Sequence, residues 1–425
     1  MAGVPLFIKN RGASMKSVPD RLQPAGVTWC CLYLKQPPSN KTCWPQQEPN
    51  CSANNQGDIM DRRRFIGTSL AAGAAALAAS RAAAAAETIL KDCQALDTLP
   101  YFTRDAAGAL ILRPEVAEKI IDFHTHIGLS FLGMAPLDLD REDDEAKPYF
   151  PVRGNEINMD TYAAASFTPE TEKTAQQESV KQAFTKKGYA GTHTPKNLLK
   201  EMDRNRVTHS VLLAIDYPGL SHNSETYLKV CREHPRLIPF VSVHPKDARL
   251  EHKTRAFREA GAVGMKVHPP MQFIRANHPK CMKLTKLCGE LGMPVLFHSG
   301  HSPIAPGFQK DYPRIEHFEE PVAKQPGTTF VLGHGGIDQW RELIALAKKN
   351  ANVWIEISGQ PPAHIREMLD AGLEDRVLFG SDWPYYLESL PLAKLLLATD
   401  DAPAVRQKLL YDNAVRLLRK AGISI

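Results

Sequence analysis

Polar side chains that could perform chemistry stand at the ends of successive short apolar segments in this sequence. His124 and His126, in IDFHTH, are two residues apart, so on a strand both imidazoles point to the same face. Neutral imidazoles suit zinc and related divalent ions, and a catalytic site usually keeps three or four protein ligands with one position open for water. The other polar residues at such segment ends are His244, Lys266, His268, His298, His334, Glu356, Ser358 and Asp382.

Eight apolar, β-branched segments carry these residues, and each is followed by a stretch with a helical pattern. Near-continuous hydrophobic strands separated by helices indicate a parallel sheet that is covered on both faces. Eight such units predict a (β/α)8 TIM barrel, in which the C-terminal strand ends converge on one pocket. An open doubly wound sheet is the alternative, but no glycine-rich phosphate loop follows the first strand. The segments are 119–127, 208–216, 237–244, 262–268, 294–300, 328–335, 352–358 and 376–382.

A long insertion, 128–193, separates the first strand from the helical pattern that begins near Thr194 and Pro195. Its length of about 65 residues far exceeds the usual connection of about two to six residues. We expect one helix within it, capped by Thr168 with Pro169 at its first position. Because loops at this end of a barrel form the active-site rim, the insertion is expected to be a lid and specificity element. A surface excursion without substrate contact is the alternative.

Four motifs together resemble a known family. They are HTH at the first strand, PVLFHSG at the fifth, FVLGHGG at the sixth and LFGSDWP at the eighth. In this order and spacing they resemble the amidohydrolase superfamily, specifically its amidohydrolase-related (type 2) branch, which includes aminocarboxymuconate-semialdehyde decarboxylase-like enzymes and metal-dependent hydrolases. The GMKVHP and DNAVRLL segments are also similar, and the resemblance covers about residues 115–420.

The resemblance implies that His124, His126, His298 and Asp382 bind one divalent metal ion, most often zinc, with manganese as the alternative. It also implies that His334 is the catalytic histidine close to a metal-bound water. A divalent cation lowers the pKa of its water toward about 7 and polarises a substrate carbonyl. His334 can then orient or deprotonate that water, and Asp382 can carry a proton to the leaving group.

Four further positions are candidates at the same strand ends. The wider superfamily offers one interpretation of Lys266, as a carboxylated lysine that bridges two metal ions. An uncarboxylated Lys266 would instead pair with a substrate carboxylate or phosphate, or with Glu356 inside the barrel. His268 is either a second-metal or substrate-binding residue or a hydrogen-bonded structural residue. Trp383 and Glu356 are candidate walls of the substrate pocket, although an aromatic residue at a barrel rim can also be plain packing.

The N-terminal part of the chain divides into two segments. Residues 60–87 read MDRRRFIGTSLAAGAAALAASRAAAAAE, a basic cluster followed by an apolar stretch and small residues, which is typical of a signal peptide. Arg62 and Arg63 resemble the twin-arginine class, and the apolar run is shorter than the roughly 20 residues that span a bilayer. We therefore expect export to the periplasm, with a cytoplasmic location as the alternative. Residues 1–59 are interpreted as a disordered leader or a start-site artefact, and 88–425 as the barrel.

Charge and cysteine content exclude further classes of function. The chain carries 52 Lys+Arg against 47 Asp+Glu, and the basic excess lies in its N-terminal part. The remainder is close to neutral and offers no electrostatic footprint for nucleic acid. The eight cysteines form no paired CxxC motif, which excludes a disulfide scaffold and a zinc ribbon.

The first functional hypothesis is a metal-dependent hydrolase that cleaves a C–O or C–N bond of a small molecule, such as a lactone, ester or amide. A non-oxidative decarboxylase of the same family is the alternative, in which His334 or Asp382 supplies the proton that replaces CO2. A second alternative is a non-catalytic periplasmic binding or scaffold protein, although the intact ligand set argues against it. We expect no stable membrane insertion of the mature form, and the resemblance implies a homodimer.

Overall fold

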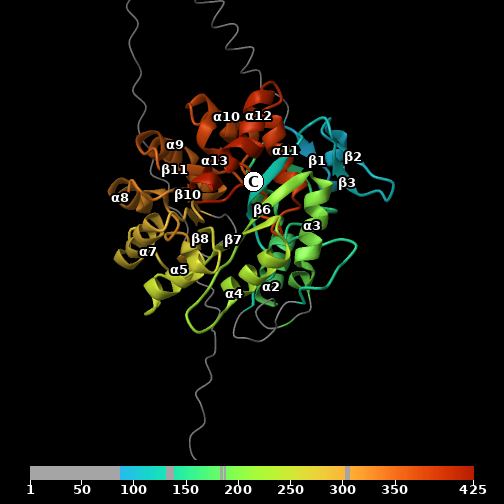
Figure 1. Cartoon of the computed structure of the whole chain (residues 1–425). Helices are drawn as coiled ribbons and strands as arrows, with labels where there is room; N and C mark the ends of the chain where they lie inside the picture. The colour runs from blue at the N-terminus through green and yellow to red at the C-terminus, as the bar shows by residue number, and fades with distance from the viewer. Residues whose placement is uncertain (1–86, 131–137, 182–184, 186–187, 302–306) are drawn as a thin grey trace, which may run out of the picture. The chain divides into compact units, whose positions relative to one another are not determined.

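The computed structural model describes residues 87–130, 138–181, 185, 188–301 and 307–425. Within these residues, eight parallel strands form one sheet in the order β12, β11, β10, β9, β8, β7, β6, β4 (Figure 1). The strands are β4 (Ile120–Thr125), β6 (Val207–Leu213), β7 (Leu237–Val241), β8 (Gly264–Val267), β9 (Val295–Phe297), β10 (Phe330–Leu332), β11 (Val353–Glu356) and β12 (Val377–Leu378).

Hydrogen bonds between the β4 segment and the segment that directly follows β12 close this sheet into a barrel. The Phe123 amide donates to the Phe379 carbonyl at 2.9 Å, and the His126 amide donates to the Trp383 carbonyl at 2.7 Å. In return, the Asp382 amide donates to the His124 carbonyl at 2.8 Å. The predicted (β/α)8 barrel is confirmed, and these bonds join two segments that carry predicted site residues.

Helices surround the strands on the outside of the barrel (Figure 1). Helix α3 shows why such segments fold as helices, since Thr194 Oγ1 accepts a hydrogen bond from the Asn197 amide at 3.2 Å and Pro195 occupies the first turn. Leu198 and Met202, one turn apart, are fully buried. The described helices are α2 (Pro169–Lys181), α3 (Pro195–Arg204), α4 (Asn223–Glu233), α5 (Leu250–Glu259), α6 (Pro269–Gln272), α7 (Pro279–Glu290), α8 (Glu319–Lys324), α9 (Trp340–Lys349), α10 (Pro362–Asp370), α11 (Ser389–Ala398), α12 (Pro403–Gln407) and α13 (Asn413–Lys420).

Strand alternation determines which side chains reach the inside of the barrel. Leu296 of β9 and Trp354 of β11 belong to the inner hydrophobic cluster, so the residues two positions later, His298 and Glu356, point to the same side. In β4 the inner residues are Ile121 and Phe123, and the strand pairing then shifts register between Asp122 and Thr125. A one-residue irregularity of this kind changes the face of the following side chains, which brings His124 and His126 inward.

The segment between β4 and α3 contributes helix α2 (Pro169–Lys181) and strand β5 (Ile157–Asn158), which pairs antiparallel with β1 (Ile89–Leu90). The Thr171 amide donates to Thr168 Oγ1 at 3.2 Å, which confirms the predicted cap of this helix. Preceding the barrel, β2 (Phe102–Arg104) and β3 (Leu110–Leu112) form an antiparallel pair.

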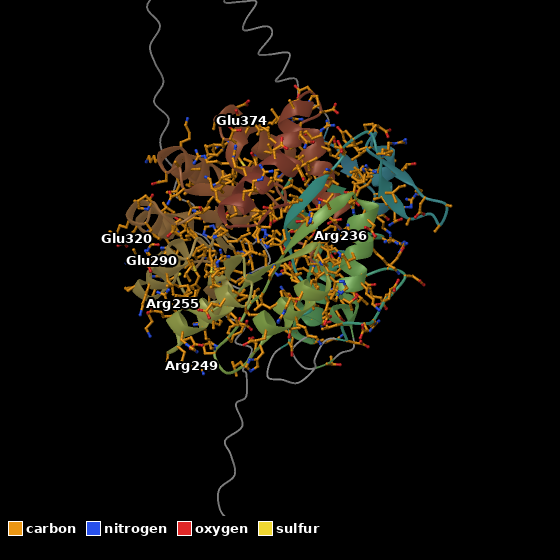
Figure 2. The ribbon with its side chains drawn as sticks, in the orientation of Figure 1. Arg236, Arg249, Arg255, Glu290, Glu320 and Glu374 are labelled. Atoms are coloured by element: carbon orange, nitrogen blue, oxygen red, sulfur yellow. The ribbon has the colours of Figure 1, made fainter. Side chains whose placement is uncertain are left out.

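Charged side chains lie at the periphery of the outer helices, as Arg249, Glu290 and Glu320 illustrate (Figure 2). The leader and signal peptide that the sequence predicts for residues 1–59 and 60–87 fall almost wholly outside the described residues, of which Glu87 is the first. Among the described residues, none of the helices has both the length and the apolar character needed to traverse a bilayer.

Candidate active site

The three predicted ligands from the first and last strands converge at the C-terminal end of the barrel. Asp382 Oδ1 lies 3.5 Å from His124 Nε2 and 3.6 Å from His126 Nε2. The ligand atoms of these three residues all lie within 4.8 Å of one another. Two imidazoles and a carboxylate at this separation form a donor set that suits a zinc-like divalent ion.

His298 and His334 reach the same place from β9 and from the turn after β10. Their rings lie 4.5 Å apart, and the His334 ring lies 4.7 Å from that of His124. His298 Nε2 is buried and has no hydrogen-bond partner among the described residues. A buried imidazole nitrogen without a partner is costly unless a ligand satisfies it, so this atom supports the fit of a metal ion to the site.

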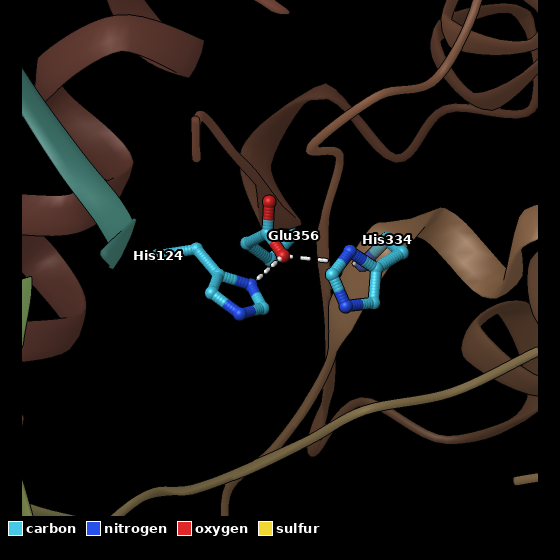
Figure 3. Close-up of side chains that lie close together, drawn as sticks. All are labelled: His124, His334 and Glu356. Carbon is cyan, nitrogen blue, oxygen red and sulfur yellow. Dashed lines mark hydrogen bonds and ion pairs between the residues drawn. The ribbon is translucent and has the colours of Figure 1, made fainter. Parts of the chain in front are cut away.

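Hydrogen bonds fix the orientation of the imidazoles. Glu356 Oε2 lies 2.6 Å from His124 Nδ1, and the Leu213 carbonyl lies 2.8 Å from His126 Nδ1 (Figure 3 shows the Glu356 contact). Both acceptors require the hydrogen on Nδ1, so Nε2 of each ring carries the lone pair that can bind a cation. Burial lowers the pKa of His124 well below 6.5 and that of His298 to about 3, so both rings are neutral at pH 7.

His334 is oriented by the same carboxylate. The backbone amide of His334 donates to Glu356 Oε2 at 3.1 Å (Figure 3). The Nδ1 atom of His334 lies 2.8 Å from Ser358 Oγ. Ser358 Oγ in turn donates to Glu356 Oε2 at 3.1 Å. Because the Ser358 hydroxyl hydrogen is used toward Glu356, Oγ accepts from His334 Nδ1–H. His334 therefore presents a bare Nε2 that can accept a proton.

Two site residues hold strained backbone conformations. His334 has φ 57° and Asp382 has φ 59°, both in the left-handed region that favours glycine. Such a conformation costs about 1–3 kcal/mol and persists only where the surrounding structure enforces it, typically at functional sites. At the neighbouring turn, a Cβ on Gly300 would lie 2.0 Å from the Gly336 carbonyl oxygen, so glycine is required there for close packing.

Lys266 lies next to His124 and lines the same cavity. Its Nζ is 3.1 Å from His124 Nε2, and the side chain is fully buried. Desolvation lowers the pKa of Lys266 to about 8, while the negative charges of Asp382 and Glu356 oppose this shift. Because Nε2 has one lone pair, a cation bound to His124 would displace Lys266 from this contact, and Lys266 would then offer its positive charge to another partner in the site.

The two remaining predicted histidines, His268 and His244, differ in whether they line the cavity. His268 stacks on His298 with ring centres 4.4 Å apart and lines the cavity, while its Nδ1 accepts from the Met271 amide at 3.2 Å and caps α6. His244 instead lies 3.0 Å from the Gln272 carbonyl through Nε2, away from the cavity wall.

A cavity of about 350 Å³ lies above this centre. Four tyrosines form much of its wall, namely Tyr149, Tyr162, Tyr385 and Tyr386. Tyr149 and Tyr162 come from the long segment after β4, where the sequence has no periodicity that would single them out. Sequence reasoning missed both for that reason, and it also missed His193 from the same segment.

Two predicted wall residues lie behind the cavity. Trp383 is fully buried, and its ring contacts the His193 ring at 5.9 Å, so it supports the wall from outside. Glu356 is also fully buried, because its carboxylate is used by His124, His334 and Ser358. Neither residue is among those that line the cavity, and a direct contact of either with substrate stays a prediction.

The histidine-rich centre lies at the C-terminal strand ends of a closed barrel, which is where (β/α)8 enzymes carry their active sites. Residues 121–420 match the family model described as amidohydrolase, and the chain belongs to this family. No curated protein shows significant sequence similarity to the chain.

Solved structures with a similar fold share little sequence with this chain. An uncharacterised TIM-barrel protein from Bordetella bronchiseptica is 19% identical with a TM-score of 0.51, and the match covers 72% of this chain and 100% of that chain. A 5-carboxyvanillate decarboxylase from Novosphingobium aromaticivorans, complexed with manganese, is 15% identical with a TM-score of 0.48 (73% and 98% covered). A probable 2-pyrone-4,6-dicarboxylic acid hydrolase from Acinetobacter baumannii is 16% identical with a TM-score of 0.44 (71% and 99% covered). The first likeness supports the barrel fold.

Proposed function

We propose that this enzyme is a non-oxidative decarboxylase of small aromatic or similarly unsaturated carboxylates. The observation that carries the proposal is the composition of the cavity, whose lining includes four tyrosine rings and the amino group of Lys266. Planar rings pack well against aromatic side chains, and a carboxylate pairs with an ammonium group or a metal ion. The proposal replaces the hydrolysis of a lactone, ester or amide as the first functional hypothesis.

The size of the cavity fits this class of substrate. A cavity of about 150 Å³ lined by apolar side chains holds one benzene ring, and the cavity here measures about 350 Å³. It therefore accommodates a ring together with a carboxylate and further substituents. Ile127, Leu129 and Ile215 add apolar surface to the tyrosine wall, which favours a ring over a strongly hydrated substrate.

One divalent metal ion fits the proposal, held by His124, His126, His298 and Asp382, with zinc as the first expectation and manganese as the alternative. When bound, it would supply Lewis-acid stabilisation of the negative charge on the substrate. Lys266 would pair with the substrate carboxylate, which leaves as neutral CO2. The reaction exchanges a C–CO2⁻ bond for a C–H bond and consumes one proton.

The protein side chains would handle that proton. Asp382, held between His124 and His126, would deliver it to the ring carbon that bears the carboxylate. His334, whose Nε2 lone pair is free, would accept a proton from solvent and return it to Asp382 for the next turnover. The apolar wall would exclude bulk water, so the electrostatic interactions within the site act in a low dielectric.

The test measures the release of CO2 and the deuteration of the ring. The substrates are benzoates labelled with ¹³C at the carboxyl carbon and assayed in D2O, and aryl lactones, esters and amides are assayed beside them. Decarboxylation releases ¹³CO2 and places deuterium on the ring carbon that carried the carboxylate. Asp382→Asn should abolish both signals, whereas the exposed-surface variant Lys348→Met on α9 should retain them. Hydrolysis of a lactone, ester or amide without CO2 release from any carboxylate would overturn the proposal in favour of a hydrolase.

We also infer that residues 60–87 export the enzyme and that residues 1–59 take no part in catalysis. The support is the pattern of two arginines, an apolar run and small residues in the sequence. Deletion of 1–59 should leave periplasmic delivery and activity unchanged, and Arg62→Lys together with Arg63→Lys should retain the protein in the cytoplasm. Export of the double variant at the normal level would contradict the assignment.

A further inference from the structure

His193 contributes an imidazole to the cavity wall that the proposed reaction does not use. It lies at the end of the segment before α3, with 1% of its surface exposed, and its ring lines the cavity. Edge-on contacts hold the ring in place, with the Tyr149 ring at 5.1 Å and the Trp383 ring at 5.9 Å. Its backbone is also fixed, because its carbonyl accepts from the Gly128 amide at 2.8 Å.

The hydrogen bond at Nε2 of His193 determines whether Nδ1 donates or accepts a hydrogen bond. His193 Nε2 lies 2.8 Å from the Lys147 carbonyl, and a carbonyl only accepts, so Nε2 carries the hydrogen. Burial lowers the pKa of His193 to about 4, which agrees with a neutral ring at pH 7. In that ring Nδ1 has no hydrogen and is a hydrogen-bond acceptor.

Nδ1 has no donor from the protein within the described residues, since every hydrogen bond found for His193 uses its Nε2, amide or carbonyl. Because His193 is almost completely buried, lines the cavity and uses Nε2 for Lys147, Nδ1 is the ring nitrogen that remains for a molecule in the cavity. A bound molecule can therefore donate to this atom.

We propose that His193 is a specificity-determining residue whose Nδ1 accepts a hydrogen bond from a hydroxyl group on the ring of the bound carboxylate. A buried acceptor that stays unpaired costs more free energy than a hydrogen bond to it gains. Nδ1 in this largely apolar wall therefore discriminates mainly by weakening the binding of ligands that have no donor for it. Ligands with a ring hydroxyl at the matching position are selected over ligands that lack a donor there. The carboxylate part of this ligand rests on the proposed function, whereas the hydroxyl preference rests on His193 alone.

The experiment compares binding rather than turnover. The full-length protein is titrated calorimetrically with 2-, 3- and 4-hydroxybenzoate and with the corresponding fluorobenzoates, because fluorine is similar in size to a hydroxyl but donates no hydrogen bond. For at least one ring position the hydroxyl compound should bind about tenfold more tightly than its fluoro counterpart. Equal affinities at all three positions would overturn the inference.

Two matched variants separate recognition from structural support. The terminal amide of glutamine reaches about as far as Nε2, so His193→Gln keeps a donor for the Lys147 carbonyl and removes the acceptor at Nδ1. Asparagine places its amide oxygen near the position of Nδ1, so His193→Asn keeps the acceptor and loses the bond to Lys147. The hydroxyl preference should disappear in His193→Gln and persist in His193→Asn, and it should be unchanged in His252→Phe, an exposed control on α5.

The outcomes distinguish this inference from the proposed reaction. Preserved hydroxyl preference in a folded His193→Gln protein would show that another group selects the ligand, whatever the enzyme does to it. Hydroxyl preference that depends on His193 without CO2 release would support the inference and contradict decarboxylation. Decarboxylation of benzoates with no hydroxyl preference would support the proposed reaction and contradict the role of His193.

Discussion

Replacement of Lys394 by methionine should change the pH dependence of stability in a way that the structure specifies. Lys394 lies on α11, is fully buried, and its Nζ donates to three backbone carbonyls. The acceptors are Asn158 at 3.3 Å, Met159 at 2.8 Å and Thr161 at 2.7 Å. This contact anchors the segment that carries Tyr162 into the cavity wall.

Burial lowers the pKa of Lys394 from 10.5 to about 7, opposed only in part by the charge of Asp160. Between these two values the unfolded chain binds the proton and the folded protein does not, so stability rises with pH. The slope is about 1.4 kcal/mol per pH unit, which gives about 2–3 kcal/mol between pH 7.5 and 9.5. Below about pH 7 both states are protonated, and the slope vanishes.

The measurement is urea denaturation of the wild type and Lys394→Met at half-unit steps from pH 6 to 9.5. The free energy of unfolding of the wild type should gain about 2–3 kcal/mol on that of the variant above pH 7.5, with no divergence below pH 7. Lys348→Met on the exposed face of α9 should run parallel to the wild type throughout. Parallel curves for Lys394→Met would refute the reasoning, because they would mean that the three carbonyls keep Nζ charged in the folded protein up to the pH at which the unfolded chain loses the proton.

Three further predictions concern the candidate metal centre. His298→Ala should lower bound metal per chain and activity together, as measured by elemental analysis and turnover on the same sample; full metal content would remove His298 from the ligand set. His334→Ala should retain the metal but lose activity by about 10²–10⁴-fold, and a variant that turns over at the wild-type rate would show that His334 is not in the proton path. Glu356→Gln should weaken metal affinity about 10–100-fold in a competition with a chelating dye, because its carboxylate orients His124, and unchanged affinity would argue against that role.

The barrel was predictable because its strands are buried on both faces. Such strands read as continuous β-branched runs, and the observed strands fall within or beside the eight predicted segments, as β9 at Val295–Phe297 does within 294–300. The lengths of the strands were harder to predict from the sequence. β12 has only two residues, Val377 and Leu378, because the chain then turns toward Asp382. Asp382 has a positive φ, which its residue type alone does not predict.

The convergence of the histidines was also predictable, because strand ends in a barrel meet at one place. The direction of individual side chains was not. Glu356 and Trp383 stand beside cavity residues in the sequence, yet both point behind the wall, Glu356 because it hydrogen-bonds His124. The contribution of Tyr149 and Tyr162 depends on long-range backbone contacts, such as the Tyr149 amide to the Pro384 carbonyl at 3.0 Å, which leave no local pattern.

Closure of the barrel and assembly of the site depend on the same hydrogen bonds. Asp122 Oδ1 accepts from the His124 amide at 2.9 Å and from the Ser381 amide at 3.0 Å, and the His124 carbonyl accepts from the Asp382 amide. The first and last strands are therefore joined at the residues that present His124 and Asp382 to the cavity. Because closure enforces the left-handed conformation of Asp382, the cost of that strain is met during folding and not during binding. The candidate ligand atoms are consequently prearranged before any cation or substrate arrives, which is the condition that electrostatic catalysis requires.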